Sequence, residues 1–387
     1  MERTTAKKNK YEIDMCNGTI MDKLISFSLP LMLSGILQLM FNAVDIIVVG
    51  RFSGSQALAA VGSTSALINV FTNLFIGISL GANVLTARFY AAGREKEVSE
   101  TVHTAITLAL VSGIVMALVG LVFSKGALAL MGTPDDVIGL SALYMRIYFL
   151  GMPFFMLYNY GAAILRAVGD TKRPLLFLMI AGVINACLNM VLVIVFKLGV
   201  AGVAIATVIS QMISCVLVLR CLCRSESSYR LRFSELGMKG YYLKQIFSVG
   251  VPAGIQSTVI NFSNVLLQSS VNSFGSTAMA GYTAANNLLG FLYVSVNSIT
   301  QACMSFTSQN YGVGKLKRMD RVLADCMILS VVVAVVLGCI CYGFGPEILQ
   351  IYTEDAEVIA CGMEILAYTT ITYFLCGWMD LFPGALR

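Results

Sequence analysis

Charged residues are scarce in this sequence, and histidine is scarcer still. Only 12% of the 387 residues are Asp, Glu, Lys or Arg, whereas 57% are hydrophobic and the mean hydropathy is +0.80. Soluble domains carry roughly 25% charged residues, so the composition excludes that class and indicates a polytopic membrane protein. With one histidine and no acid cluster, the chain offers little for metal ligation or for a nucleophile with its base, and we expect no enzyme.

The cysteines do not predict a disulfide framework. Most of the eleven lie within apolar stretches or near positions expected on the inner side. Cys221 and Cys223 form a C-x-C pair, which alone is a weak signal for metal or redox chemistry. The first 18 residues are polar and basic, without an apolar core and cleavage site, so they predict a cytoplasmic tail rather than a signal peptide.

Apolar stretches long enough to cross a bilayer recur along the chain. Windows of about 20 residues predict an all-α membrane protein with ten spans, at 24–50, 57–88, 101–123, 138–166, 175–196, 200–222, 244–272, 278–310, 322–344 and 358–386.

Basic residues predict the orientation of these spans. If the N-terminus is cytoplasmic, 22 Lys and Arg fall on the inner side and four on the outer side, namely Arg51, Lys125, Arg146 and Lys197. This asymmetry follows the positive-inside rule and predicts a multi-pass protein of the cell membrane. It also explains the net charge of +5 without a nucleic-acid partner.

An internal duplication organises the chain. A stretch beginning at Pro30 matches one beginning at Pro252, and the register still holds where Arg166 matches Arg387. Because the first copy has an even number of spans, the copies are expected to be related by a pseudo-twofold axis along the membrane normal. We therefore predict a tail at 1–23, an N-lobe of six helices at 24–223, a cytoplasmic linker at 224–243 and a C-lobe of four helices at 244–387.

The second copy stops at the position where the first continues into two more helices. We expect that the chain is cut short by roughly 55 residues, which corresponds to two spans of about 20 residues and their loops. On this hypothesis the complete protein has twelve spans in two six-helix lobes.

The first predicted helix carries the strongest functional signal. Gln38, Asn42 and Asp45 are spaced at i, i+4 and i+7, so they share one helix face. A carboxylate at membrane depth costs roughly 2.5 to 3.5 kcal/mol and is expected to face a bundle interior or a wet cavity. Pro30 removes one backbone hydrogen bond and predicts a hinge in the same helix.

Several motifs occur in order along the chain: NAVDIIVVGRFSG ending the first helix, ILRAVGDTKRP after the fourth, GVAGVAIATVISQ on the sixth and PGALR at the end. With these motifs the sequence resembles the multidrug and toxic compound extrusion (MATE) family from about Lys23 onward. The resemblance implies two six-helix lobes that export small cationic or amphiphilic molecules in exchange for H⁺ or Na⁺. It implies no cofactor, no metal beyond a possible Na⁺, and a monomer in the bilayer.

The resemblance also implies an ion-coupling site. The family's first-helix acid corresponds to Asp45, and its partners in one prokaryotic branch correspond to Asn185, Asn189 and Thr207. At Asn189 an amide replaces the family's acid, which weakens the case for a sodium site. Tyr144 corresponds to a tyrosine of the same network.

Further polar residues predict the walls of a substrate cleft between the lobes. They are Gln38, Asn42, Asn159, Asn261, Asn264, Gln268 and Asp380. Interhelical hydrogen bonds offer an alternative role for the amides. For His103, at the inner end of the third helix, we expect a surface role.

A flippase for lipid-linked saccharides is the alternative function. Such transporters share the architecture of the wider superfamily, but tend to line their cavity with basic residues that meet phosphates. The predicted spans contain almost none, and the acid in the first helix favours cations.

Overall fold

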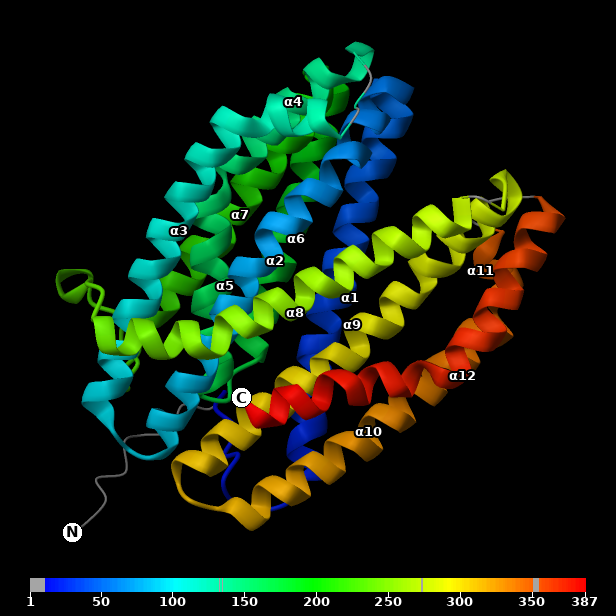
Figure 1. The fold of residues 1–387 in the computed structure, drawn as a ribbon. Helices are drawn as coiled ribbons and strands as arrows, with labels where there is room; N and C mark the ends of the chain where they lie inside the picture. The colour runs from blue at the N-terminus through cyan, green and yellow to red at the C-terminus, as the bar shows by residue number, and fades with distance from the viewer. Residues whose placement is uncertain (1–10, 132, 134, 273, 351–354) are drawn as a thin grey trace, which may run out of the picture. The chain divides into compact units, whose positions relative to one another are not determined.

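The computed structural model describes residues 11–131, 133, 135–272, 274–350 and 355–387, and these ranges contain helices and connections but no strand (Figure 1). The all-α prediction is therefore confirmed. The helices are α1 (Met21–Ser53), α2 (Ser55–Ala91), α3 (Glu95–Leu130), α4 (Asp135–Leu150), α5 (Met152–Ala167), α6 (Lys172–Asn189), the π-helix η1 (Met190–Val195), α7 (Gly199–Cys223), the 3₁₀ turn η2 (Phe233–Glu235), α8 (Gly240–Asn272), α9 (Ser276–Gly312), α10 (Leu316–Gly343), α11 (Gly345–Leu349) and α12 (Ala356–Leu386).

Each predicted span coincides with one helix or with a bent pair of helices. The fourth span is α4 and α5, which meet at 47°, and the tenth is α12, whose halves meet at 50° beside residue 371. By length and hydropathy, six helices of the described residues could cross a membrane, or eight if each bent pair is one span. The other two long helices, α8 and α9, carry many Asn and Gln residues, which make them less apolar.

The duplication predicted from the sequence is visible in the backbone. Helices α1 and α8 each have 33 residues, and α2 and α9 each have 37. Gly54 and Gly275 directly precede the second helix of each copy with φ of 86° and 99°, and Gly93 and Gly314 lie in the turn after it with φ of 69° and 74°. Glycine is the residue that adopts positive φ without strain. The two copies therefore turn at the same positions.

Packing divides the chain into two compact units. Of the described residues, unit 1 contains those within 11–13 and 37–257, and unit 2 contains those within 14–36 and 258–387. The division runs through α1 and α8, so that residues 24–36 pack in unit 2 and residues 244–257 pack in unit 1. The lobe boundaries inferred from the sequence stay a prediction. Helices α1 and α8 are equivalent under the repeat offset of 222. After this offset, the positions at which the boundary between the units crosses the two helices differ by only one residue.

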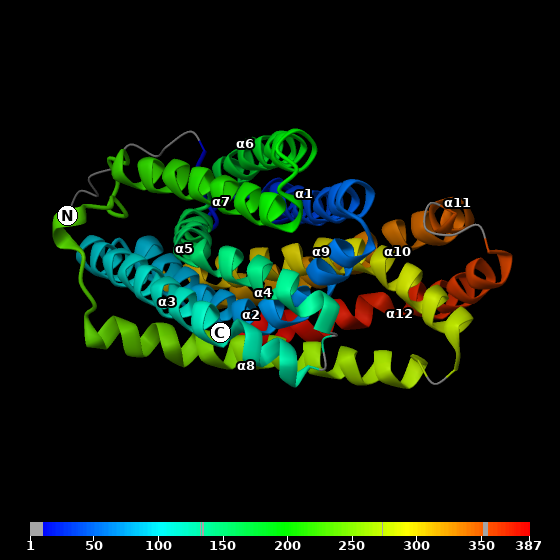
Figure 2. The same ribbon diagram turned by 90° about the horizontal axis from the view of Figure 1, so that it is seen from above.

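Helix α5 is the centre of unit 1. It packs against α2, α3 and α7 and lies between α7 and the α2–α3 pair when seen from above (Figure 2). Its buried side chains include Met152, Met156 and Tyr160, which are 0% exposed. Close packing with three neighbouring helices stabilises α5 mainly through van der Waals contacts, because lipid tails are as apolar as its side chains.

The described part of the predicted tail is packed against the helices. In unit 1, the carboxylate of Glu12 accepts hydrogen bonds from the hydroxyls of Tyr90 and Tyr229, both at 2.8 Å. In unit 2, Met15 is 0% exposed, and its carbonyl accepts a hydrogen bond from the side-chain amide of Asn310 at 3.2 Å. The segment therefore contributes to both units.

The linker between α7 and α8 also packs on unit 1. Tyr229 and Leu231 are 0% and 2% exposed, and the backbone N–H of Arg232 donates to Nε2 of His103 at 3.0 Å. His103 is only 3% exposed, so the expectation of a surface position was wrong. The reason is tertiary, since a linker far away in the sequence covers a helix end that is otherwise polar.

Two helices of unit 1 approach each other through glycines. A Cβ placed on Gly77 would lie 2.4 Å from the backbone of Gly254, and a Cβ on Gly81 would lie 2.2 Å from the carbonyl oxygen of Ile246. Such distances are too short for any side chain. The small-xxx-small spacing of Gly77 and Gly81 thus allows α2 to contact the first half of α8 backbone to backbone, as is common between membrane helices.

We predict that Gly81→Ala destabilises the protein by about 1–3 kcal/mol, because overpacking forces the two backbones apart. Gly62→Ala on the same helix is the matched control. A Cβ there meets nothing within 4 Å, so the higher helix propensity of alanine should leave stability unchanged or raise it. Thermal unfolding in detergent measures both, and equal midpoints for the two variants would contradict the close contact.

Candidate ion-coupling site

Asp45 lies in the part of α1 that belongs to unit 1 and points into that unit. It is 9% exposed, and Val48 and Val49, one turn further along, are 6% and 0% exposed. Ile46 and Ile47 lie on the other side of the helix and are 45% and 61% exposed. The apolar sequence around Asp45 therefore forms a helix whose buried stripe includes one carboxylate.

Helix α6 and helix α7 supply the contacts of this carboxylate. The side-chain amide of Asn189 donates to Oδ1 of Asp45 and also to Oδ1 of Asn185, the latter at 3.1 Å. The hydroxyl of Thr207 lies 3.5 Å from Oδ2 of Asp45 and 3.0 Å from the carbonyl oxygen of Val203. The structure thus brings together four predicted residues that are up to 162 positions apart in the sequence.

The local backbone helps to place Asn189. Asn185 and Asn189 are one turn apart on α6, and both are buried. Immediately after Asn189 the helix widens into the π-helix η1. Short π-helical segments occur frequently at functional sites because they shift the register of the side chains that follow.

Two tyrosines of α4 complete the surroundings of Asp45. Tyr144, a predicted member of the site, is 7% exposed and stacks on Tyr148 with a centroid distance of 6.1 Å. Both hydroxyls interact electrostatically with the carboxylate of Asp45, and Gln211 hydrogen-bonds to Tyr148. Tyr148 and Gln211 were not predicted from the sequence. Each lies four residues after a predicted member, Tyr144 or Thr207, and this spacing places them on the same helix faces.

The hydrogen bonds suit both protonation states of Asp45. Thr207 has one proton, which it can donate either to the carbonyl of Val203 or to an ionised Asp45. When Asp45 is protonated at Oδ2, its own O–H can donate to the Thr207 oxygen, while Thr207 keeps its bond to Val203. Asn189 donates to Oδ1 in both cases. A rotation of one hydroxyl therefore accommodates the gain or loss of a proton.

The same residues offer oxygen ligands to a small cation. The side-chain oxygen of Asn189 is buried and has no hydrogen-bond partner among the described residues. Asp45, Asn185 and Thr207 contribute further oxygens at the same place, and hard cations prefer such ligands. The arrangement fits Na⁺ in ligand type, with one carboxylate to balance the charge.

The other predicted residues in unit 1 lie outside this cluster. Gln38 and Asn42 share the face of α1 that leads to Asp45, but they are exposed. Asn159 is half-buried and donates its amide back to the carbonyl of Phe155 at 2.8 Å, so its hydrogen bond is internal to α5.

The remaining predicted residues belong to unit 2. Asn264 is exposed, whereas Asn261 and Asp380 are half-buried, and the side chain of Gln268 lies outside the described residues. Pro30 lies in the unit 2 part of α1, which stays continuous there, and its carbonyl accepts a hydrogen bond from the Ser34 hydroxyl at 2.8 Å. The cleft between the lobes and the hinge stay predictions.

Comparison with known proteins identifies the family. The model of the MatE family matches residues 30–191 and 252–387, which are the two copies of the duplication. The chain belongs to the MatE family. The match covers both repeats and most of the chain, so the resemblance inferred from the motifs is confirmed.

Curated relatives and a solved structure agree with this assignment. The chain is 33% identical over 370 residues to the probable multidrug resistance protein YoeA of Bacillus subtilis, covering 93% of this chain and 80% of the relative. It is 23% identical over 368 residues to the multidrug export protein MepA of Staphylococcus aureus, covering 94% and 80%. A MATE family transporter solved in an outward-facing conformation has the same fold, with a TM-score of 0.91 at 20% identity over 98% of this chain and 86% of the other. The protein is thus a member of a family of multidrug efflux transporters and not an enzyme.

We predict that Asp45 and Asn189 are energetically coupled. Asp45→Ala and Asn189→Ala should each lower the midpoint of thermal unfolding. The midpoint of the double variant should be close to that of the less stable single variant. The reason is that removing either partner already breaks the bond, and coupling of contacting groups amounts to about 0.5–3 kcal/mol.

Asn159→Ala provides the control for this cycle. Its amide bonds within its own helix, so its effect should add to that of Asp45→Ala. Additive effects of Asp45→Ala and Asn189→Ala would show that the hydrogen bond between them does not contribute to stability.

Proposed function

We propose that this MatE family member is a secondary antiporter that exports organic cations in exchange for protons, with Asp45 as the group that both ions occupy in turn. The observation that carries the proposal is a buried carboxylate held by neutral donors. Among the described residues Asp45 takes part in no ion pair, and its hydrogen-bond partners are an amide and a hydroxyl. Asp170 is also buried, but it is paired with Arg173.

The absence of a basic partner in the described residues leaves the negative charge of Asp45 for a mobile cation. An intramembrane carboxylate is costly while it is ionised and unpaired. Either a proton or an organic cation removes that cost, but the two cannot neutralise the same carboxylate together. Competition for one charge is the simplest physical basis of exchange, because each ion must leave before the other can bind.

The charges determine which gradient drives the exchange. A charge that crosses the membrane potential gains or loses about 2.3 kcal/mol per 100 mV. When one proton enters for each monovalent cation that leaves, no net charge moves. The pH gradient should therefore drive transport of a monovalent cation, and the membrane potential alone should not.

Sodium is the second candidate for the coupling ion. It is favoured by the buried side-chain oxygen of Asn189, which has no hydrogen-bond partner among the described residues. A sodium ion at this oxygen and at Asp45 would neutralise the carboxylate as a proton does. Protons remain the first choice, because the alternative hydroxyl positions of Thr207 already satisfy the protonated acid.

We predict that Asp45→Asn abolishes proton-coupled export. Proteoliposomes that contain the variant should show no efflux of a fluorescent organic cation under an imposed pH gradient, because the amide cannot bind and release a proton. Asp320→Asn, an acid-to-amide change at an exposed position of α10, should keep full activity. Persistent exchange in Asp45→Asn would place the coupling group elsewhere.

We predict that Asn189→Asp changes the ion dependence of transport. The new carboxylate would lie within hydrogen-bonding distance of Asp45, and two like charges at such a distance favour binding of a proton or a cation. The pH optimum of transport should rise, and a sodium gradient should drive efflux better than in the unchanged protein. Identical pH and sodium profiles for both proteins would argue against a role for this position in ion binding.

A further inference from the structure

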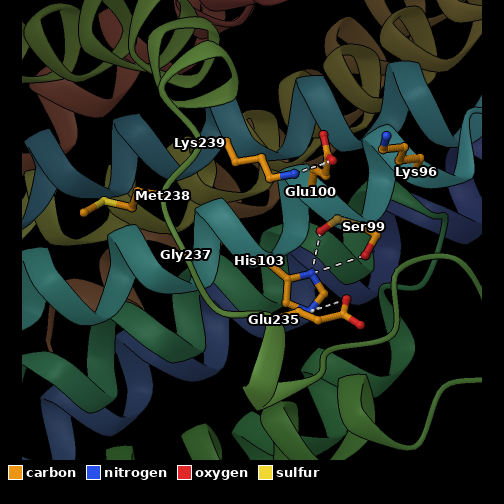
Figure 3. A pocket seen from close by; sticks show the side chains of 8 residues that line it. All are labelled: Lys96, Ser99, Glu100, His103, Glu235, Gly237, Met238 and Lys239. Atoms are coloured by element: carbon orange, nitrogen blue, oxygen red, sulfur yellow. Dashed lines mark hydrogen bonds and ion pairs between the residues drawn. The ribbon is translucent and has the colours of Figure 1, made fainter.

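A cavity of about 400 Å³ lies between the beginning of α3 and the linker that leads into α8. Figure 3 shows its lining, which consists of Lys96, Ser99, Glu100 and His103 from α3 and of Glu235, Gly237, Met238 and Lys239 from the linker. All of these residues belong to unit 1. The ion-coupling site does not use them.

His103 holds the linker at the base of this cavity. Its Nδ1 lies 2.6 Å from the carbonyl oxygen of Ser99, and its Nε2 accepts the backbone N–H of Arg232 at 3.0 Å. A carbonyl can only accept and a backbone N–H can only donate. Both bonds exist together only in the neutral imidazole that carries its proton on Nδ1.

Charged groups face the imidazole from both elements. On the linker, the Glu235 carboxylate lies 3.9 Å from Nε2 of His103 and is paired with Arg232 at 2.8 Å. On α3, Glu100 forms an ion pair with Lys239 of the linker. Lys96 lines the same cavity, and Tyr242 at the start of α8 hydrogen-bonds to Glu100.

Glu235 stays ionised in the range in which an imidazole titrates. The Arg232 guanidinium, which donates to its carboxylate, holds the pKa of Glu235 below its usual range. Histidine is the side chain that ordinarily changes charge between about pH 5 and pH 8. A protonated His103 would therefore have an anionic partner within reach.

We propose that His103 is a pH-sensitive latch, which holds the linker on α3 while its imidazole is neutral and releases the backbone of Arg232 when it is protonated. A protonated Nε2 has no lone pair, so it cannot accept the N–H of Arg232. The same nitrogen becomes a donor that faces Glu235. The linker then loses the hydrogen bond from the Arg232 backbone to His103 and gains an ion pair between His103 and Glu235, three residues further along the chain.

The latch is close to the start of a helix that belongs to both units. The backbone N–H of Lys239 donates to the hydroxyl of Thr104 at 3.3 Å, and α8 begins at the next residue, Gly240. Release of the linker thus loosens the attachment of this helix to α3. In the orientation predicted by the basic residues the latch faces the cytoplasm, where the proposed exchange would deliver protons. Only this consequence for transport rests on the proposed function.

Hydrogen exchange of the linker amides tests the latch, with two variants of opposite effect. The side-chain oxygen of His103→Gln can accept the N–H of Arg232 but does not titrate in this range, so residues 231–236 should exchange slowly at pH 8 and at pH 5.5. His103→Leu removes the acceptor, and the segment should exchange rapidly at both pH values.

The unchanged protein should behave like His103→Gln at pH 8 and like His103→Leu at pH 5.5. After correction for intrinsic rates, the difference should be about tenfold, which is the effect of losing one hydrogen bond of ordinary strength. The proposal would be overturned if the linker amides of the unchanged protein exchanged as slowly as those of His103→Gln at both pH values. The measurement needs no transport, so its outcome is independent of whether the antiport proposal holds.

The single histidine of the chain allows a direct second measurement. Ring nitrogen resonances of ¹⁵N-histidine-labelled protein should show the neutral Nδ1–H form at pH 8 and a charged ring at the pH at which the linker is released. A neutral Nε2–H form at pH 8, or a ring that charges without any change in linker exchange, would contradict the latch. Glu235→Gln should shift the release to lower pH, because it removes the anion that stabilises the charged ring.

Discussion

A carboxylate within a membrane helix needs hydrogen-bond donors, and two neighbouring helices supply them to Asp45. An ionised acid at membrane depth costs roughly 2.5 to 3.5 kcal/mol on insertion scales. Asn189 on α6 and Thr207 on α7 reduce that cost for Asp45 on α1 by donating to its two oxygens. Neither partner carries a charge, so the carboxylate is solvated by dipoles but not neutralised. Under the proposed exchange, this difference between solvation and neutralisation is what lets a mobile cation bind at Asp45.

The sequence predicted the helices well because each depends on a long apolar stretch, a signal that does not need tertiary information. The bend between α4 and α5 was not predicted, although Gly151 and Pro153 mark its place. Glycine and proline weaken a helix, but whether it bends depends on the packing around it. The equivalent bend in α12 lies beside residue 371, where neither residue is present, and therefore could not be read from local sequence.

The candidate site was predicted in the parts that repeat a family motif or a helical spacing, and missed in the parts that depend on tertiary contacts. Asp45, Asn185 and Asn189 were found in these ways. Tyr148 was missed because an aromatic residue in an apolar helix is ordinarily part of the packing. His103 was misplaced because its burial depends on a linker that arrives from about 130 residues further along the chain.

The two copies of the duplication share their backbone but differ in one functional side chain. Helices α1 and α8 have equal length, and the boundary between the compact units crosses them within one residue of equivalent positions. The two copies therefore share this divided helix. They do not share the acid, since Leu267 is the repeat equivalent of Asp45 and is 55% exposed. A second carboxylate at that position would add another ionised group with its own cost in the membrane. Asp45 therefore has no counterpart at the equivalent position of the second copy, although both copies keep a helix of the same length there.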